Sequence, residues 1–233
     1  MTTATLTGTD VRERDAVLRQ LDWDPEVDAS AIGVAARNGV ITLTGFVDTY
    51  AGKLAAERAA KRVHGVKAVA NDIEVRLKHD RTDADIAADA ARALTLRDTV
   101  PDRIQATVHH GNITLTGRVR WLYQKRAAAT AVKYIRGARG IFNHIDVQAE
   151  AAGKDLRKRI VGALHRNADV DARHIDVVID KGTATLTGTV GSWLQREAAE
   201  EAVTHSPGVH AVDNRILVVP QSRTWHEDVD EIC

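Results

Sequence analysis

The sequence has little aromatic content and only one cysteine. Tryptophan, tyrosine and phenylalanine make up 4% of its 233 residues, and alanine, valine and isoleucine carry the apolar content, which suits thin layers packed closely together. A single cysteine, Cys233 at the last position, excludes an intramolecular disulfide. Small apolar side chains, rather than covalent cross-links, must therefore hold the fold together.

Long apolar runs and an excess of charge are also lacking. No stretch approaches the ~20 apolar residues of a membrane-spanning helix, and the N-terminus lacks the basic start and apolar run of a secretory signal. The formal net charge is zero, which gives no global attraction to nucleic acid or membrane. With 44% hydrophobic and 27% charged residues, we expect a globular, cytoplasmic protein that could lie peripheral to a membrane.

One threonine-rich phrase occurs four times. "ITLTG" stands at 41–45 and 113–117, and "TATLTGT" stands at 183–189 and 3–9. The glycines of the phrases at 41–45, 113–117 and 183–189 are 72 and 71 residues apart. The same offsets relate four further sets of residues. These sets are Gly65, Gly137 and Gly208; Asn71, Asn143 and Asn214; Ile73, Ile145 and Ile216; and Ile32, Ile104 and Ile175.

This spacing predicts a tandem array of three similar units. The units span residues 10–77, 83–148 and 154–218, and flexible tails at 1–9 and 219–233 flank them. The linkers between the units are short and fall outside the repeat pattern. We therefore expect three small domains rather than one large one.

Each unit shows the same order of patterns. An apolar stripe at helical spacing, such as Leu156, Ile160 and Leu164, predicts a first helix. Alternating apolar residues predict two strands joined by a tight turn, clearest at the "NG" of residues 38–39, which favours a type I′ hairpin. Small residues at four-residue spacing predict a second helix, and a third strand follows. The prediction is an α+β fold of three αββαβ units, each a three-stranded sheet with two helices on one face.

Three recurring positions have predicted local roles. The glycine of each "LTG" phrase falls on the inward side of its strand, where it would permit a bulge or the close approach of a helix. Gly65 and its counterparts are predicted to cap the C-terminal end of the second helix. Asn71 and its counterparts could bind a ligand, but we favour an Asx-turn that opens the third strand.

Together these motifs resemble the BON domain of bacterial osmotic-shock and transport-associated proteins. The pattern "G-x-x-T-L-T-G-x-V" followed by "G-V-x-x-V-x-N-x-I" is matched by "GVITLTGFV" with "GVKAVANDIEV", and by "GTATLTGTV" with "GVHAVDNRILV". The middle unit departs conservatively at Ala138 and Ile141. The resemblance covers about residues 10–218. It implies stress association and binding to phospholipid surfaces or small ions, in the periplasm or outer membrane, and it implies no chemistry.

No pattern typical of catalysis or of a metal site is present. The ten histidines are scattered, and the adjacent His109 and His110 would point to opposite faces of a strand or turn. Glu200 and Glu201 fit a solvated helix face. Cys233 is interpreted as inert, with redox activity or palmitoylation as the alternatives. We predict a protein that is not an enzyme and has no catalytic residue, metal or cofactor.

The charge of the separate units singles out the middle one. Residues 83–148 hold 10 Lys and Arg against 6 Asp and Glu, whereas the first unit holds 10 against 11 and the third 9 against 9. Basic and aromatic residues gather in "GRVRWLYQKR", residues 117–126. The predicted lipid- or anion-binding residues are Arg118, Arg120, Trp121, Tyr123, Lys125 and Arg126. Aromatic rings beside basic side chains are typical of proteins that contact an anionic membrane surface.

Alternatives remain open for this stretch and for the whole chain. The aromatic residues, with Tyr50 and Trp193 in the matching loops, could fill the bottom of each small core, and the basic residues could bind single-stranded nucleic acid or protein. We predict a stress-associated binding or scaffolding protein whose partner is an anionic phospholipid or envelope component, without sequence-specific nucleic acid. The alternatives are a monovalent-cation (potassium) binder or sensor, and a self-assembling structural protein. Self-assembly would form a homo-oligomer through residues 3–9, added as a strand to the sheet edge of another chain.

Overall fold

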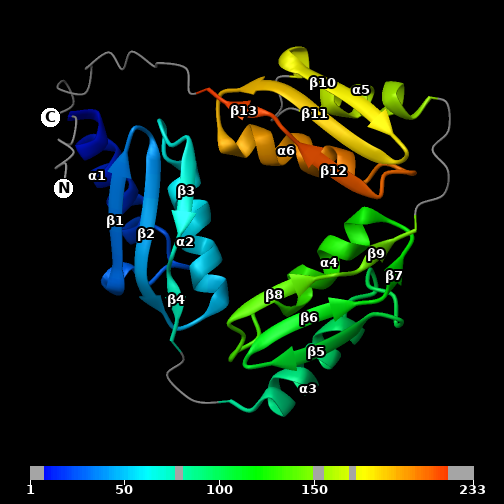
Figure 1. Cartoon of the computed structure of the whole chain (residues 1–233), viewed down its shortest axis with the longest axis horizontal. Coiled ribbons are helices and arrows are strands. Elements are labelled where there is room, and N and C mark those ends of the chain that lie inside the picture. The colour runs from blue at the N-terminus through cyan, green and yellow to red at the C-terminus, as the bar shows by residue number, and fades with distance from the viewer. Residues whose placement is uncertain (1–7, 77–80, 149–154, 168–171, 220–233) are drawn as a thin grey trace, which may run out of the picture.

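The computed structural model describes residues 8–76, 81–148, 155–167 and 172–219, which form three repeats of one architecture (Figure 1). Repeat 1 consists of α1 (Gly8–Trp23), β1 (Ile32–Arg37), β2 (Val40–Val47), α2 (Tyr50–Arg62), β3 (Ala68–Asn71) and β4 (Glu74–Val75). Repeat 2 consists of α3 (Asp83–Thr95), β5 (Gln105–His109), β6 (Asn112–Thr116), β7 (Arg118–Val119), α4 (Leu122–Val132), β8 (Gly140–Asn143) and β9 (Asp146–Val147). Repeat 3 consists of α5 (Leu156–Arg166), β10 (Ile175–Asp180), β11 (Thr183–Val190), α6 (Trp193–Thr204), β12 (Ala211–Asn214) and β13 (Leu217–Val218). Short 3-10 turns, η1 (Ala29–Ala31) and η2 (Ala172–His174), precede β1 and β10.

The second strand lies in the middle of each sheet. β1 and β2 are antiparallel, with Ile32 opposite Gly45, and β2 and β3 are parallel, with Val40 opposite Ala68. Because parallel neighbours need a crossover connection, α2 lies between β2 and β3 in the chain. The orders β5–β6–β8 and β10–β11–β12 repeat this arrangement. The predicted α+β fold of three αββαβ units is confirmed.

The hairpin turn between the first two strands has the predicted type. Asn38 and Gly39 have φ values of 53° and 82°, and positive φ at both central residues defines the type I′ turn. The corresponding turns of the other repeats also have two positive φ values, at His110 and Gly111, and at Lys181 and Gly182. The turn type is therefore common to all three repeats, although only the first carries the "NG" signature.

The third strand is interrupted in every repeat by the same asparagine. The side-chain oxygen of Asn71 accepts a hydrogen bond from the backbone amide of Ile73 at 3.3 Å. Its side-chain nitrogen donates to the carbonyl of Lys53 on α2 at 3.1 Å. Asn143 and Asn214 make the same pairs of bonds. The predicted Asx-turn is present, but it divides the third strand rather than opening it, and it ties that strand to the second helix.

The glycine of each "LTG" phrase allows a close backbone approach. Gly45 and Gly188 have φ values of +107° and +123°. A Cβ atom at these positions would lie 2.0 Å from the carbonyl oxygen of Ala31 and 1.9 Å from that of His174. In repeat 2, Gly117 separates β6 from β7. The approaching segment is thus the turn that precedes the first strand, not the helix that the sequence suggested.

The glycines predicted to cap the second helix lie beyond its end. α2 ends at Arg62, and Gly65, with φ +93°, lies in a following turn closed by a hydrogen bond from Val66 N to Val63 O at 3.4 Å. Gly137 and Gly208 occupy the equivalent turns, also with positive φ. The prediction of a cap is therefore wrong: the chain needs the glycine to turn from the helix towards the third strand.

The "TATLTGT" segment at residues 3–9 runs into the first helix. α1 begins at Gly8, so Gly8 and Thr9, which end the "TATLTGT" segment, are helical rather than extended. Residues 3–7 of the proposed oligomer-forming strand lie outside the described residues, as does Cys233. The strand prediction for residues 3–7 therefore stays a prediction.

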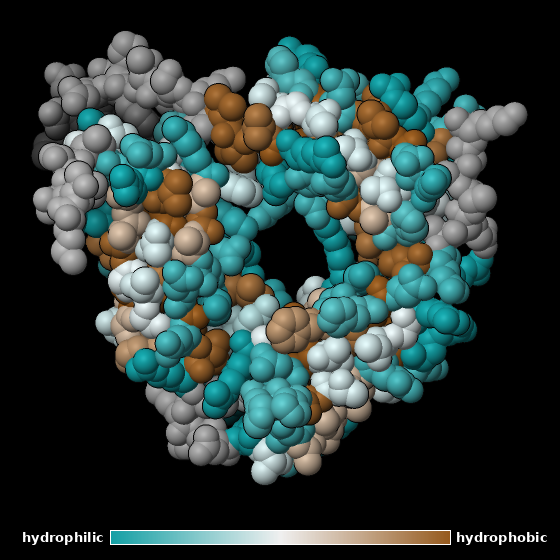
Figure 2. Space-filling view, in the orientation of Figure 1, coloured by the Kyte–Doolittle hydropathy of each residue, from teal (hydrophilic) through white to brown (hydrophobic). Residues whose placement is uncertain are grey.

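The three repeats surround a central opening, which the space-filling view shows in the middle of the molecule (Figure 2). The second helices α2, α4 and α6 lie on the side towards this opening (Figure 1). Repeat 1 has an apolar core of its own, around Val17, Ile41 and Leu43. The buried residues of repeats 2 and 3 form one connected cluster, against which Tyr50 of repeat 1 also packs. The repeats therefore pack against one another as well as folding around their own cores.

Candidate anion-binding surface of repeat 2

The stretch 117–126 runs from β7 across a short connection into α4. Val119 and Leu122 are buried, at 3% and 8% exposure, and they fix the chain against the core of repeat 2. Because side chains alternate along a strand, Arg118 and Arg120 on either side of Val119 are exposed. The core contacts of two apolar residues thus turn the basic residues outwards.

Trp121 occupies the position that caps the second helix in the other repeats. Thr49 accepts a hydrogen bond from Gly52 N at 3.0 Å, and Ser192 accepts one from Gln195 N at 3.3 Å. Trp121 has no such side-chain oxygen, and Gln124 Oε1 instead accepts from the backbone amide of Trp121 at 3.1 Å. Repeat 2 therefore has a half-exposed indole where the other two repeats have a capping hydroxyl.

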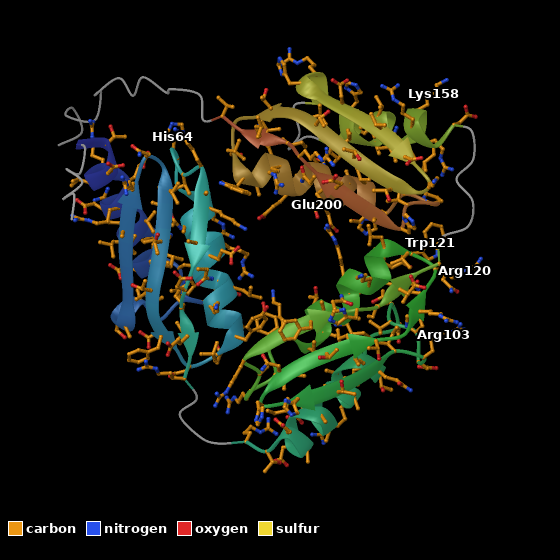
Figure 3. The ribbon with its side chains drawn as sticks, viewed as in Figure 1. His64, Arg103, Arg120, Trp121, Lys158 and Glu200 are labelled. Carbon is orange, nitrogen blue, oxygen red and sulfur yellow. The ribbon has the colours of Figure 1, made fainter. Side chains whose placement is uncertain are left out.

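Four residues form what we term the outer basic edge: Arg103, Arg118, Arg120 and Trp121. The three arginines line a pocket of about 170 Å³ together with Pro101, Val119, Gln124 and Gln148. Figure 3 shows Arg103, Arg120 and Trp121 together on the outer side of repeat 2, away from Glu200, which lies towards the middle of the molecule. Within the described part of the chain, neither Arg103 nor Arg118 forms an ion pair.

Arg103 was not among the predicted residues. It lies before the first strand, fourteen residues from Gly117 in the sequence, but its carbonyl oxygen would be only 2.8 Å from a Cβ on Gly117. The available signal was the repeat pattern, which places Ile104 opposite the glycine of its own "LTG" phrase. Any basic residue next to Ile104 therefore belongs to the same edge.

The other three predicted residues point towards the neighbouring repeats. The Tyr123 ring stacks on His205 of repeat 3, with centroids 5.4 Å apart and planes at 6°. Arg126 forms ion pairs with Glu200 and, at 2.9 Å, with Glu201 of α6. Lys125 lines the same junction. The structure thus divides the six predicted residues into two groups, although the Trp121 and Tyr123 rings remain 6.4 Å apart.

An aromatic residue at the start of each second helix contacts the next repeat. Tyr50 of repeat 1 is hydrogen-bonded to the backbone of Ile141 in repeat 2, and burial raises its pKa. Tyr123 of repeat 2 stacks on His205 of repeat 3. Trp193 of repeat 3 donates from Nε1 to the carbonyl of Val66 in repeat 1 at 3.1 Å. These three contacts run in one direction and close a ring, so the aromatics join repeats rather than filling the bottom of their own cores.

The carboxyl groups with lowered pKa values have structural partners. Hydrogen bonds from the backbone amides of Gly111 and His110 lower the pKa of Asp83 at the start of α3. Burial acts to raise the pKa of Glu57, but hydrogen bonds from Lys61 and Asn71 outweigh it and the pKa is lowered. Structural networks shift pKa values as catalytic sites do, and these two carboxylates fasten helices to strands and turns.

Metal-ligand clusters and membrane-spanning helices are both missing from the described residues. Among them, no group of three or more His, Cys, Asp and Glu side chains is placed to hold a metal ion. The neighbouring His109 and His110 rings are 4.2 Å apart but inclined by 71°. No helix in the same part of the chain is long and apolar enough to cross a membrane.

Comparison with known proteins gives one family. The family model described as BON domain matches the chain three times, at residues 9–76, 82–149 and 153–220. Among solved structures, the C-terminal domain of CdsD, a structural protein of the type III secretion system of Chlamydia trachomatis, is 15% identical at a TM-score of 0.26, with 88% of this chain and 96% of that chain covered. A second CdsD structure is 16% identical at a TM-score of 0.25, covering 89% and 92%. No curated protein matches the chain. At such TM-scores the CdsD structures carry no argument about function.

Proposed function

The chain belongs to the BON domain family, as three tandem copies, and on that premise we propose that it is a non-enzymatic protein that binds anionic phospholipid surfaces. Its contact in this proposal is the outer basic edge of repeat 2. The observation that carries the proposal is the grouping of three arginines beside an indole on one outward side of that repeat. Peripheral binding to a membrane fits the stress- and envelope-associated setting of the family.

The chemistry of the outer basic edge suits a phosphate-bearing surface. An arginine guanidinium can donate two parallel hydrogen bonds to one phosphate group. Tryptophan prefers the headgroup level of a membrane, where the ring is half apolar and half wet. Each basic residue near an anionic surface contributes about 1 kcal/mol. Arg103 and Arg118, which form no ion pair within the described residues, therefore supply about 2 kcal/mol, which corresponds to a roughly thirtyfold preference for anionic over neutral lipid.

The other two repeats lack this combination at the same positions. The counterparts of Arg118, Arg120 and Trp121 are Phe46, Asp48 and Thr49 in repeat 1, and Thr189, Gly191 and Ser192 in repeat 3. We therefore assign lipid contact to repeat 2. Tyr123 and Arg126, which contact repeat 3, have a different role in this proposal.

The repeat architecture supplies its own loss-of-function variant. The triple change Arg118→Thr, Arg120→Gly and Trp121→Ser gives repeat 2 the residues that already fold at these positions in repeat 3. It also restores a capping hydroxyl, worth about 1 kcal/mol to the helix. We expect co-sedimentation with phosphatidylglycerol-containing vesicles to fall at least about tenfold, while the melting temperature stays the same or rises.

A matched control lies at the other end of α4. The change Tyr134→Ser, Arg136→Thr and Arg139→Gly likewise removes two arginines and one aromatic residue from the same repeat. An 11-residue helix separates the two groups by roughly 16 Å. This control should bind anionic vesicles as the unaltered protein does. Equal binding of the unaltered protein to anionic and neutral vesicles, or equal losses in both triple variants, would contradict the proposal.

A further inference from the structure

The repeats meet around a cavity that the outer basic edge does not share. It has a volume of about 790 Å³ and is lined by residues of all three repeats. Arg58 comes from α2, Lys125 and Arg126 from α4, and Glu197 and Glu201 from α6. This volume falls within the range of about 300–1,000 Å³ that small-molecule sites occupy. A solute-sized space therefore exists where the three repeats join.

Basic side chains outnumber acidic ones in the lining of this cavity. Four cations, Arg58, Arg97, Lys125 and Arg126, face two carboxylates, Glu197 and Glu201. Both carboxylates already have cations beside them: Arg126 is 2.9 Å from Glu201, and Lys61 is 4.0 Å from Glu197. An anionic group on an incoming ligand would therefore meet positive charge that the carboxylates of the lining do not fully neutralise.

Two of the four cations have no partner of their own within the described residues. Arg58 pairs with Glu26 at 2.5 Å, and Arg126 pairs with two glutamates. Neither Arg97 nor Lys125 has a side-chain hydrogen bond or ion pair in the described parts of the chain. Arg97 follows α3, whereas Lys125 lies in the first turns of α4. The two cations without partners thus come from two different elements of repeat 2.

The remaining lining offers a flat ring and neutral hydrogen-bonding groups. The stacked pair of Tyr123 and His205 forms part of the wall, and Thr99, Thr130 and Asn143 add hydroxyl and amide groups. Several cations, polar groups and a flat ring around a space of about 790 Å³ suit an extended anion better than a single small ion. Arginine in particular is matched to phosphate through its planar fork of donors.

We propose that this cavity binds a small molecule carrying a chain of phosphate groups, either an inorganic polyphosphate or a nucleoside triphosphate. The phosphates lie between Arg97 and Lys125, and their charge is also felt by Arg58 and Arg126. Because the lining comes from three repeats, the bound molecule bridges them. A ligand that binds only the closed ring stabilises the ring by RT ln(1 + [L]/Kd). The melting temperature therefore rises with ligand concentration.

The test uses the full chain and two probes, tripolyphosphate and ATP, in titration calorimetry at low salt. We expect saturable one-site binding that weakens with salt and raises the melting temperature. Arg97→Ala and Lys125→Ala should each lower the affinity at least about tenfold, because each removes a charge-assisted contact. Lys53→Ala, at the counterpart of Lys125 in repeat 1, is the matched control and should bind as the unaltered protein does.

The two probes distinguish the sources of the phosphate chain. Equal affinity for both assigns the site to the phosphate chain alone, and tighter binding of ATP adds stacking of the base on the wall that the Tyr123 and His205 pair forms. Absence of saturable binding of either probe up to about 1 mM, or unchanged affinity in both cavity variants, overturns the proposal. Arg97→Ala should bind anionic vesicles as the unaltered protein does. A negative result with the two phosphate probes therefore overturns only the cavity proposal, and the vesicle experiment tests the lipid proposal separately.

Discussion

At the scale of single residues, the glycine that ends each "LTG" phrase meets two constraints at once. Its φ is positive in all three repeats, a region in which side chains with a Cβ are strained. A Cβ on Gly188 would also collide with the carbonyl oxygen of His174. The neighbouring threonines are subject to neither constraint. They recur because a β-branched polar side chain suits a half-exposed strand.

We therefore expect Gly188→Ala to destabilise repeat 3 by about 1–3 kcal/mol, the usual cost of a forced backbone conformation, with the collision adding to it. Gly162 in α5 provides a control of opposite sign. A Cβ there would meet only the flexible end of Arg166 at 3.2 Å, so Gly162→Ala should stabilise the helix by about 0.5–1 kcal/mol. Urea unfolding of both variants measures the difference. Equal changes in the free energy of unfolding would show that the positive φ of Gly188 does not determine the cost of the substitution.

At the scale of elements, a helix is fastened to the hairpin turn by one carboxylate. Asp83 at the start of α3 accepts hydrogen bonds from the backbone amides of His110 and Gly111, both at 2.8 Å. In repeat 1, Asp10 of α1 accepts one from Asn38 at 2.6 Å. These carboxylates satisfy backbone amides of the hairpin turn and thereby fix the first helix against it.

This contact makes stability depend on pH. The hydrogen bonds hold the pKa of Asp83 below its usual value in the folded state, with those from Gly111 and His110 as the main causes. Its contribution is therefore complete above the unfolded pKa of about 3.9 and is lost as pH falls through the folded pKa. Between about pH 5 and pH 3, we expect the melting temperature of Asp83→Asn to fall less steeply with decreasing pH than that of the unaltered protein.

The control for that experiment is Asp98→Asn, which changes an exposed carboxylate in the loop after α3. It should leave the pH dependence of the melting temperature as it is in the unaltered protein. If Asp83→Asn gives the same acid slope as Asp98→Asn, the carboxylate at the hairpin turn does not contribute to acid sensitivity.

At the scale of the whole molecule, three similar junctions close a ring. Each junction joins the start of a second helix to the following repeat, through Tyr50, Tyr123 and Trp193. Such head-to-tail contacts between different surfaces form a closed ring only where the rotation returns to its start. Here the three copies belong to one chain, so the ring closes within the molecule.

The junction between repeats 2 and 3 also depends on charge. Arg126 lies between Glu200 and Glu201, and its side chain is 37% exposed. Exposed pairs contribute only about 0.2–1 kcal/mol each, so deletion alone should have a small effect. Reversal in Arg126→Glu places like charges together, and we expect the radius of gyration measured by X-ray scattering to rise as this junction opens.

Restoration of the pair tests whether charge is the cause. The double variant Arg126→Glu with Glu201→Arg should recover the compact radius, and Arg136→Glu, an equal charge change on an exposed side chain of the same repeat, should not expand the molecule. Because exposed charges are screened at high ionic strength, the effect of reversal should shrink as salt is added. An unchanged radius in Arg126→Glu would mean that the ion pairs do not hold the ring closed.

The sequence by itself determined the repeat number, the order of elements and several local structures. The type I′ turn at Asn38 and Gly39 and the Asx-turns at Asn71 and its counterparts were all predictable. These features depend on residues close together in the chain or on a pattern that three copies repeat. The role predicted for Gly65 was wrong because a glycine with positive φ suits both a helix cap and the turn that follows a helix, and the local sequence does not distinguish the two.

Only the tertiary structure decided how the basic stretch is divided. The sequence shows Arg118 to Arg126 as one run, whereas folding directs Arg118 outwards and Arg126 to a glutamate 75 residues away. It also brings Trp193 to a carbonyl 127 residues away, and it adds Arg103 to the outer basic edge. Contacts between repeats depend on how whole folded surfaces fit together, and periodicity within one repeat carries no information about that fit.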